Sequence, residues 1–247
     1  MHKKTVFAAV FSLFALNFAG EANALNVFSE FGSRVTQDSM KPFAKDLGGL
    51  LGSADFHSAR TMGFPGFDIG VAGVFQTKPD TGNSILRDAG VDAFGLPIVQ
   101  AEVGLPKNFG VVLRSLPISD GAPVLGAGLR YSIFRHTAAK FLPDLTVSAF
   151  YDTFSNDYMK FRHFSMDIAA GLDLPVLKPY VGLGFDSSRL ESKVSNLDVA
   201  SGDHVSVSEV RYTAGLNVTP WPFAYLFAAV SGSHGQTGFQ GGAGVKF

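Results

Sequence analysis

TGFQGGAGVKF, residues 237–247, is the stretch that decides the fold. Side chains alternate across an extended strand with a period of two, so its residues divide between two faces. One face is largely apolar and carries Thr237, Phe239, Gly241, Ala243, Val245 and Phe247. The other is small or polar and carries Gly238, Gln240, Gly242, Gly244 and Lys246. This alternation predicts a strand with apolar surroundings on one side and polar surroundings on the other.

The same alternation recurs through most of the chain upstream. It predicts strands at 68–76, 99–105, 109–114, 125–133, 145–152, 164–174, 181–186, 210–219 and 223–232, followed by the strand at 237–247. The segment 223–232 is apolar on both sides, so the pattern does not assign its faces.

A final alternating strand that ends on an aromatic residue resembles the closing strand of bacterial outer-membrane β-barrels. The resemblance implies that Phe247 is the signal read by the barrel-assembly machinery, which would then be a partner of the chain. It also implies that residues 67–247 form an all-β transmembrane barrel in the bacterial outer membrane. Single-chain bacterial barrels have even strand numbers, so we expect about ten antiparallel strands, with eight or twelve as alternatives.

The connections between the predicted strands support this fold. Every second connection, counted back from the carboxy terminus, is short and rich in proline: 219–222, 175–179 and 106–108, with 135–143 as a looser fourth. The others are longer and polar: 187–206, 77–95 and 155–160. Short turns at one end and longer loops at the other are typical of outer-membrane barrels.

Composition agrees with a barrel. The chain has 24 Phe and 28 Gly, and its mean hydropathy is +0.20, yet no apolar run after the first residues could span a membrane as a helix. Only alternate residues of a barrel strand face lipid, which produces this combination. The chain carries 20 basic and 21 acidic side chains, and this balance argues against a nucleic-acid partner. We expect outer-membrane lipids and lipopolysaccharide as partners, and the oligomeric state stays open.

The first 24 residues have the three parts of a secretory signal peptide. Lys3 and Lys4 are basic, residues 5–20 are apolar, and Ala22-Asn23-Ala24 is a small-residue cleavage site. We therefore expect export across the inner membrane with removal of residues 1–24. The chain has no cysteine, so disulfides and thiol chemistry are excluded.

Residues 25–66 form a different kind of segment. Phe28, Phe31 and Val35 recur at helical spacing, and a second stripe runs from Met40 to Leu51, with Asp38 or Ser39 as its cap. The commoner use of such a stripe is a pair of amphipathic helices on the periplasmic rim or packed against the base of the barrel, and this is the interpretation we prefer. The alternative is a plug inside the lumen or a hatch that gates it.

The end of this segment resembles a known family. Phe56-His57-Ser58-Ala59-Arg60, then Gly63-Phe64, lead into Gly66-Phe67-Asp68-Ile69. An amphipathic lead-in, a stretch with His and small residues, and then a first strand are similar to an outer-membrane barrel family catalogued only as a domain of unknown function. The resemblance covers about thirty residues and implies no activity.

The inward face of the predicted barrel carries both signs of charge. The expected lumen-lining residues are Glu102, Arg114, Arg130, Asp152, Asp167, Asp173, Asp186, Arg211 and Lys246. Ionisable groups in such a wall must be paired or hydrated, so they could form a network that closes the middle of the barrel. They could equally line a narrow pore that selects small solutes.

His163, Ser165 and Asp167 share the predicted inward face and are weak catalytic candidates, because a Ser beside a His and a carboxylate can act as a nucleophile. Their spacing resembles that of a lipid A deacylase, where a His and a Ser lie two apart on a strand. No metal-ligand spacing and no cofactor motif appear. The sequence favours a narrow channel or plugged barrel, with a structural or adhesive surface barrel as the alternative and a lipid hydrolase as the third.

Overall fold

The computed structural model describes residues 23–116, 123–136 and 142–247, and the expected signal peptide lies almost wholly outside them. Ten antiparallel strands close into one barrel, each paired with its neighbours in the chain, and the last pairs with the first. The strands are β1 (Phe67–Gln76), β2 (Phe94–Gly104), β3 (Phe109–Leu116), β4 (Val124–Phe134), β5 (Asp144–Ser155), β6 (Met159–Gly171), β7 (Leu177–Ser192), β8 (His204–Trp221), β9 (Ala224–Ser233) and β10 (Gln236–Lys246). This confirms the predicted fold class and strand number.

Closure depends on the stretch that the sequence singled out. Strand β10 pairs with β1 over nine residues, from Asp68 opposite Lys246 to Gln76 opposite Gly238. The backbone N–H of Phe67 donates to the carbonyl of Phe247 at 2.9 Å, and the reverse bond is 2.8 Å. Closure removes the two free edges that an open sheet of these strands would expose.

Apolar side chains cover the outer wall. Most of the large predicted outward residues are exposed, among them Leu113, Val181, Leu183, Val210 and Tyr212, each between 57% and 63% accessible. The structure also assigns the faces of β9: Tyr225 and Phe227 are buried inside, whereas Leu226 and Val230 face outward.

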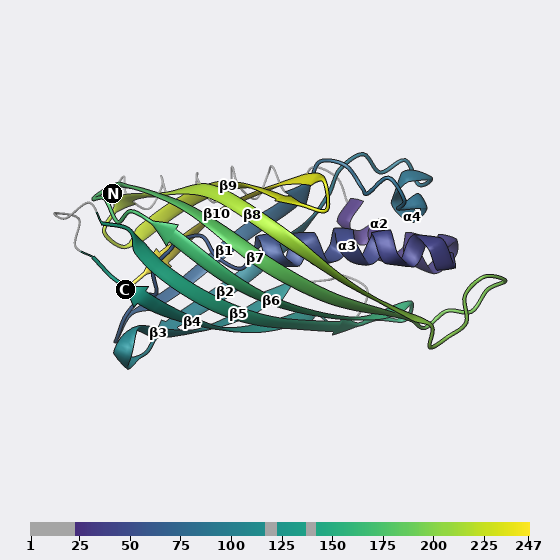
Figure 1. Cartoon of the computed structure of the whole chain (residues 1–247), viewed down its shortest axis with the longest axis horizontal. Helices are drawn as coiled ribbons and strands as arrows, with labels where there is room; N and C mark the ends of the chain where they lie inside the picture. The colour runs from purple at the N-terminus through teal and green to yellow at the C-terminus, as the bar shows by residue number, and fades with distance from the viewer. Residues whose placement is uncertain (1–22, 117–122, 137–141) are drawn as a thin grey trace, which may run out of the picture.

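The two ends of the barrel differ, as Figure 1 shows. The short turns and the carboxy terminus lie at one end, which we call the short-turn end; part of the turn predicted at 135–143 lies outside the described residues. At the opposite, long-loop end, β7 and β8 continue further than predicted, to Ser192 and from His204. The loop expected at 187–206 therefore shortens to 193–203, because Leu190 and Val207 on the extended strands pack in one apolar core with the helices.

Helices occupy the long-loop end: α2 (Asn23–Arg34), α3 (Gln37–Ser53) and the short α4 (Ser84–Arg87), with a 3-10 turn, η1 (Pro106–Asn108), at the other end. Thr36, rather than Asp38 or Ser39, caps α3: its hydroxyl accepts from the Ser39 N–H, and the Ser39 hydroxyl accepts from the Thr36 N–H. No helix among the described residues is long and apolar enough to cross a membrane.

Helix α3 lies inside the barrel mouth at the long-loop end, and not on the rim beside the short turns where the preferred interpretation placed it. It contacts β8, β7, β1, β10 and β6 from within (Figure 1). Glycines explain why it fits: a Cβ at Gly48 would come within 2.3 Å of the Ser188 hydroxyl, and one at Gly52 within 2.5 Å of the Asp186 carboxylate.

The helices and the strand ends around them share one apolar core, which we call the cap. It includes Phe28 and Phe31 of α2, Met40, Phe43 and Leu51 of α3, Leu86 of α4, and Phe94, Phe161, Leu190 and Val207 of the strands. The part of the wall between the cap and the short turns is called the spanning region below.

Candidate functional site in the barrel lumen

The chain leaves α3 and runs through the lumen before it starts the first strand. We call residues 54–66 the lumen segment. Near its start, Ser53 bonds the β9 residue Ser231, with the two hydroxyl oxygens 2.9 Å apart. At its end, the carbonyl of Gly66 accepts from the N–H of Gly104 at 2.8 Å, beside the short turn that joins β2 and β3. The segment therefore crosses the spanning region from the long-loop end to the short-turn end (Figure 1).

Asp55 fixes the lumen segment to the wall at the centre of the barrel. Its carboxylate is fully buried and meets Arg114 of β3 at 2.8 Å and Arg211 of β8 at 3.0 Å. The hydroxyl of Ser165 on β6 donates to the same carboxylate at 2.6 Å. One side chain of the segment thus joins three strands that are not neighbours in the sheet.

The two arginines are also bound to wall carboxylates. The Nε of Arg114 donates to Asp152 at 2.7 Å, and Arg211 contacts Asp167 at 2.6 Å and Asp186 at 2.9 Å. Glycines on the wall make room for this network, since a Cβ at Gly126 would lie 1.9 Å from an Asp152 oxygen. We call Asp55, Arg114, Asp152, Asp167, Asp186 and Arg211 the central cluster.

A second ion pair holds the backbone of the lumen segment. Arg130 of β4 pairs with Glu102 of β2, and both side chains are at most 2% exposed. Arg130 also donates to the carbonyl of Ser58 at 2.6 Å, while Glu102 accepts from the N–H of Met62 at 3.1 Å. Such bonds satisfy polar backbone groups that would otherwise be buried without partners.

Aromatic rings clamp the segment on its other side. The imidazole of His57 stacks on the rings of Tyr225 and Phe227, with centroid distances of 4.8 Å and 5.0 Å. Phe56 meets Tyr180 edge to face at 5.9 Å. The sequence of β9 is apolar on both sides because its inner face carries two of these rings, Tyr225 and Phe227.

Arg60 anchors the segment at the short-turn end. It pairs with Asp144 at 2.8 Å and with Asp173, which in turn pairs with Lys178. Asp173 is half-buried near the rim and does not belong to the central cluster. Lys246 is also half-buried, with its ammonium 5.9 Å from the centre of the Tyr225 ring.

The structure places the sequence-predicted lumen residues in two groups. Those inside the spanning region are each at most 5% exposed: Glu102, Arg114, Arg130, Asp152, Asp167, Asp186 and Arg211. Asp173 and Lys246 lie towards the short-turn end. Phe247, the expected assembly signal, is 75% exposed at that end.

His163, Ser165 and Asp167 do not form a catalytic triad. The Nδ1 of His163 lies 2.9 Å from the Ser188 hydroxyl, Ser165 donates to Asp55, and Asp167 binds Arg211. Inward residues two apart lie roughly 6.5–7 Å from each other along a strand, and each finds its nearest partner elsewhere. All three are also buried, at most 5% exposed.

The sequence did not identify Asp55, Ser58 and Arg60 as part of the site. They lie in a segment interpreted as a lead-in to the first strand, where periodicity gives no inward face. One available signal was the charge of Asp55 itself, which follows an apolar helix end and precedes Phe56. A carboxylate in that position needs a buried partner if the segment enters the lumen.

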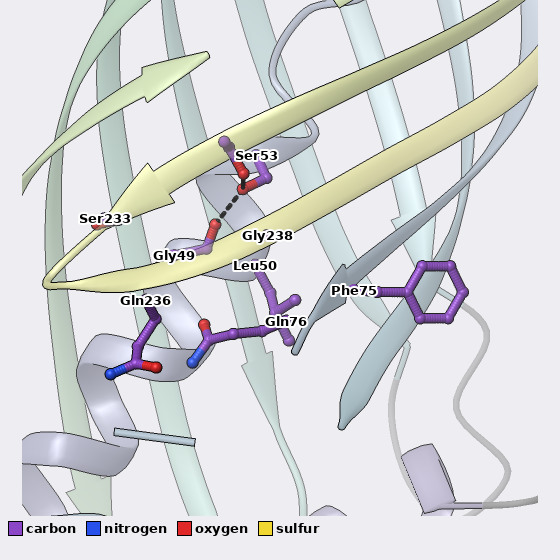
Figure 2. A pocket seen from close by; sticks show the side chains of 9 residues that line it. Gly49, Leu50, Ser53, Phe75, Gln76, Ser233, Gln236 and Gly238 are labelled. Carbon is purple, nitrogen blue, oxygen red and sulfur yellow. Dashed lines mark hydrogen bonds between the residues drawn. The ribbon is translucent and has the colours of Figure 1, made fainter. Parts of the chain in front are cut away.

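A small hollow lies at the mouth of the barrel between α3 and strands β1, β9 and β10 (Figure 2). It holds about 210 Å³ of empty space, part of it open to solvent, and is lined by Gly49, Leu50, Ser53, Phe75, Gln76, Ser231, Ser233, Gln236 and Gly238. The Phe75 ring points away from it, and the hydroxyl of Ser53 donates to the carbonyl of Gly49 at 2.6 Å. The hollow is a packing gap beside the helix and presents no assembled chemistry.

Comparison with known proteins places the chain in a family without an assigned activity. A family model described as "Family of unknown function (DUF6588)" matches residues 81–246. The match covers the strands from the first loop onward and not the stretch around His57 that suggested a resemblance. No curated protein matches the chain.

Several solved barrels are similar in fold. The amino-terminal β-barrel domain of Pseudomonas aeruginosa OprF is 14% identical, with 74% of this chain and 98% of that chain covered and a TM-score of 0.38. The Ail protein of Yersinia pestis is 15% identical, with 74% and 97% covered and a TM-score of 0.33. The KdgM porin is 8% identical, with 73% and 99% covered and a TM-score of 0.40. These likenesses are weak, and they carry none of those proteins' activities to this chain.

Proposed function

The chain belongs to DUF6588, a family of unknown function, and from its geometry we propose that it is an integral outer-membrane barrel closed by its own lumen segment. In this proposal the protein is a plugged barrel. Small polar solutes pass only when the lumen segment leaves its site, and no permanent pore is open. The observation that carries the proposal is Asp55, fully buried between Arg114 and Arg211 at the centre of the lumen.

The outer wall supports the membrane placement. Large apolar side chains stand exposed around the spanning region, including Leu113 at 62%, Leu183 at 58% and Tyr212 at 63%. Monomeric proteins in water rarely expose so continuous an apolar surface, whereas a transmembrane barrel requires one. The short-turn end then faces the periplasm, and the cap faces the outside of the cell.

The contacts of the lumen segment support a closed state. Arg114, Arg130 and Arg211 each bind both the segment and a wall carboxylate. Removing the segment would leave these arginines with fewer partners in a low-dielectric lumen, which is unfavourable unless water replaces it. Opening should therefore be rare at rest and should rise when these contacts are weakened.

A reversible disulfide lock tests this proposal. The chain has no cysteine, and the hydroxyl oxygens of Ser53 and Ser231 are 2.9 Å apart, so Ser53→Cys with Ser231→Cys should form a single engineered bridge. In planar bilayers we expect the locked protein to be silent. Asp55→Asn in the reduced double-cysteine protein should increase brief opening events, and oxidation should abolish them.

The single-cysteine variants Ser53→Cys and Ser231→Cys are the controls, because oxidation should not change their conductance. Steady conductance through the locked protein would contradict a plugged barrel. Silence of the reduced Asp55→Asn protein would contradict gating by the lumen segment and leave the barrel without a conducting state.

The cap favours a second candidate function, that of a structural or adhesive surface barrel. Its core makes the long-loop end a folded unit in which α2 packs on α4 and β2. If that end is outside the cell, a membrane-impermeant thiol reagent should label Ser33→Cys on intact cells. Val176→Cys, 50% exposed in the native protein at the short-turn end, should be labelled only after the outer membrane is permeabilised. The reverse pattern would place the cap in the periplasm.

A further inference from the structure

Two arginines face each other on the outside of the barrel. Arg162 of β6 is the register partner of Arg189 of β7, and both side chains are exposed. Directly opposite residues on one face of an antiparallel pair have Cβ atoms roughly 4.5–5.5 Å apart, and like charges there are destabilising. The arrangement needs a counter-charge.

The wall does not supply that counter-charge among the residues that the structure describes. Arg114, Arg130 and Arg211 inside the lumen all have ion-pair partners, and Arg34 on α2 pairs with Glu30, whereas Arg162 and Arg189 have none. The residues beside them in the same row are Thr153 of β5 and Ser206 of β8. The nearest carboxylate in register, Glu191, is one row further from the spanning region, opposite Lys160.

The height of this row on the wall is the second observation. The next outward row towards the short turns contains Tyr151 and Phe164, and the row after it contains Met166, Phe185 and Val210. These side chains belong to the exposed apolar belt. Successive outward rows are about 7 Å apart along a strand, so the arginines stand just beyond the edge of the belt, where lipid headgroups meet the hydrocarbon.

We propose that Arg162 and Arg189, flanked by Thr153 and Ser206, form a binding site for the phosphate of a phosphorylated glycolipid headgroup in the leaflet on the cap side. Guanidinium groups bind phosphate through paired N–H donors, and the Ser206 hydroxyl adds a further donor in the same row, whereas the Thr153 hydroxyl donates to the carbonyl of Phe161 at 3.3 Å. A lipid held at this height would keep its acyl chains against Phe164 and Met166. The inference rests on the membrane placement proposed above.

The test uses the full-length refolded protein in a neutral detergent, with purified lipid A as the probe and native mass spectrometry as the readout. Arg162→Gln with Arg189→Gln should weaken lipid A binding about tenfold or more, because charge-assisted bonds to phosphate are lost. Arg162→Lys with Arg189→Lys keeps the charge but not the paired donors, so it should bind with intermediate affinity.

Lys78→Gln with Arg87→Gln is the matched control, because it removes the same charge from exposed residues near the cap that lie outside this row. If Lys78→Gln with Arg87→Gln weakened lipid A binding as much as Arg162→Gln with Arg189→Gln, net charge alone would explain the loss. That result would overturn the proposed site. Unchanged binding in the Arg162→Gln, Arg189→Gln protein would overturn it as well. Failure of the wild type to insert into vesicles of any composition would instead overturn the membrane placement, and a simple insertion assay separates the two outcomes.

Discussion

The spanning region and the cap are built from the same strands with opposite sidedness. Along β6, Phe161 is buried inside the cap and Arg162 faces out, whereas a few residues later Phe164 faces out and Ser165 is buried inside. Strand alternation is unchanged between the two regions. Only the chemistry of the two faces is exchanged.

The neighbouring strands repeat the exchange at the same height. On β7 the inner face changes from Leu190 to Asp186, and on β8 it changes from Val207 to Arg211. In our proposal water surrounds the cap and lipid surrounds the spanning region. Helix α3 fills the first with apolar side chains, and the polar lumen segment fills the second. The comparison teaches that the reversal of pattern along a strand marks the edge of the apolar belt.

The strongest test of this comparison is a pair of substitutions on one strand. Phe161→Ala removes a fully buried ring from the core of the cap and should lower the free energy of unfolding by about 3–5 kcal/mol. Phe164→Ala, on the opposite face and 39% exposed, should lower it by much less, because no cavity is left in a packed core. Denaturant unfolding in detergent, followed by the fluorescence of the single tryptophan, measures both. Equal losses would contradict the reversal of sidedness.

The next largest effect is expected at Asp55 in the lumen. Asp55→Ala leaves Arg114 and Arg211 with wall carboxylates but without their link to the segment, so we expect a loss of about 3 kcal/mol, the low end for a broken buried ion pair. Asp38→Ala is the control, since this exposed carboxylate in the first turn of α3 interacts mainly with the helix dipole. A loss at Asp55 no larger than that at Asp38 would mean that the central cluster does not hold the segment.

The outer face gives a third test. Leu183→Arg places a charge within the apolar belt and should lower the stability of the inserted barrel by about 2–3 kcal/mol, because arginine is costly near the bilayer midplane and less so towards the interfaces. Ser187→Arg lies on the same strand and face, two rows nearer the cap and in the row of Phe164 at the edge of the belt, and should cost clearly less. Refolding into lipid vesicles followed by denaturant titration measures both. Equal tolerance of the two would contradict a lipid environment around Leu183.

The sequence predicted the spanning region well and the cap poorly, and the comparison explains the difference. In the spanning region one face of every strand is apolar, so the period of two was visible from residue 237 to 247 and upstream. In β7 and β8 the apolar face changes sides near Ser188, so the pattern broke there and 187–206 was interpreted as a loop. The alternation of apolar and polar residues predicts a continuous strand only while the apolar residues stay on one face of it.

The site was predicted in part. The wall residues of the central cluster were found because strand alternation gives an inward face, which collects Arg114, Asp152 and Arg211. Their partner Asp55 was missed, because the lumen segment has no regular structure and its contacts come from strands far away in the chain. The rim position was preferred for a related reason: apolar residues at helical spacing fit a lipid surface and the inside of a cap equally well.

Gly104 tests how tightly the lumen segment fits at the short-turn end. A Cβ there would lie 1.9 Å from the carbonyl oxygen of Gly63, whose backbone has φ +75° and is held in a turn. Gly104→Ala should therefore cost about 1–2 kcal/mol through overpacking. Gly241→Ala is the matched control, because a Cβ there meets nothing closer than 3.6 Å. If Gly104→Ala left the free energy of unfolding unchanged, the lumen segment would be held loosely at this end.

The smallest effect is expected at the start of α3, where the cap meets solvent. Thr36→Ala removes the two bonds that the Thr36 hydroxyl makes with Ser39, leaves the bond from the Thr36 N–H to the Ser39 hydroxyl, and should cost about 1 kcal/mol. Because α3 is part of the cap core and continues into the lumen segment, the loss should appear in the unfolding of the whole protein and should be recovered by Thr36→Ser, which keeps the hydroxyl. If Thr36→Ala instead releases α3 alone, Ser33→Cys would become more reactive while the unfolding midpoint of the barrel stayed unchanged. That result would mean that cap and spanning region fold as separate units, although they share every strand from β5 to β8.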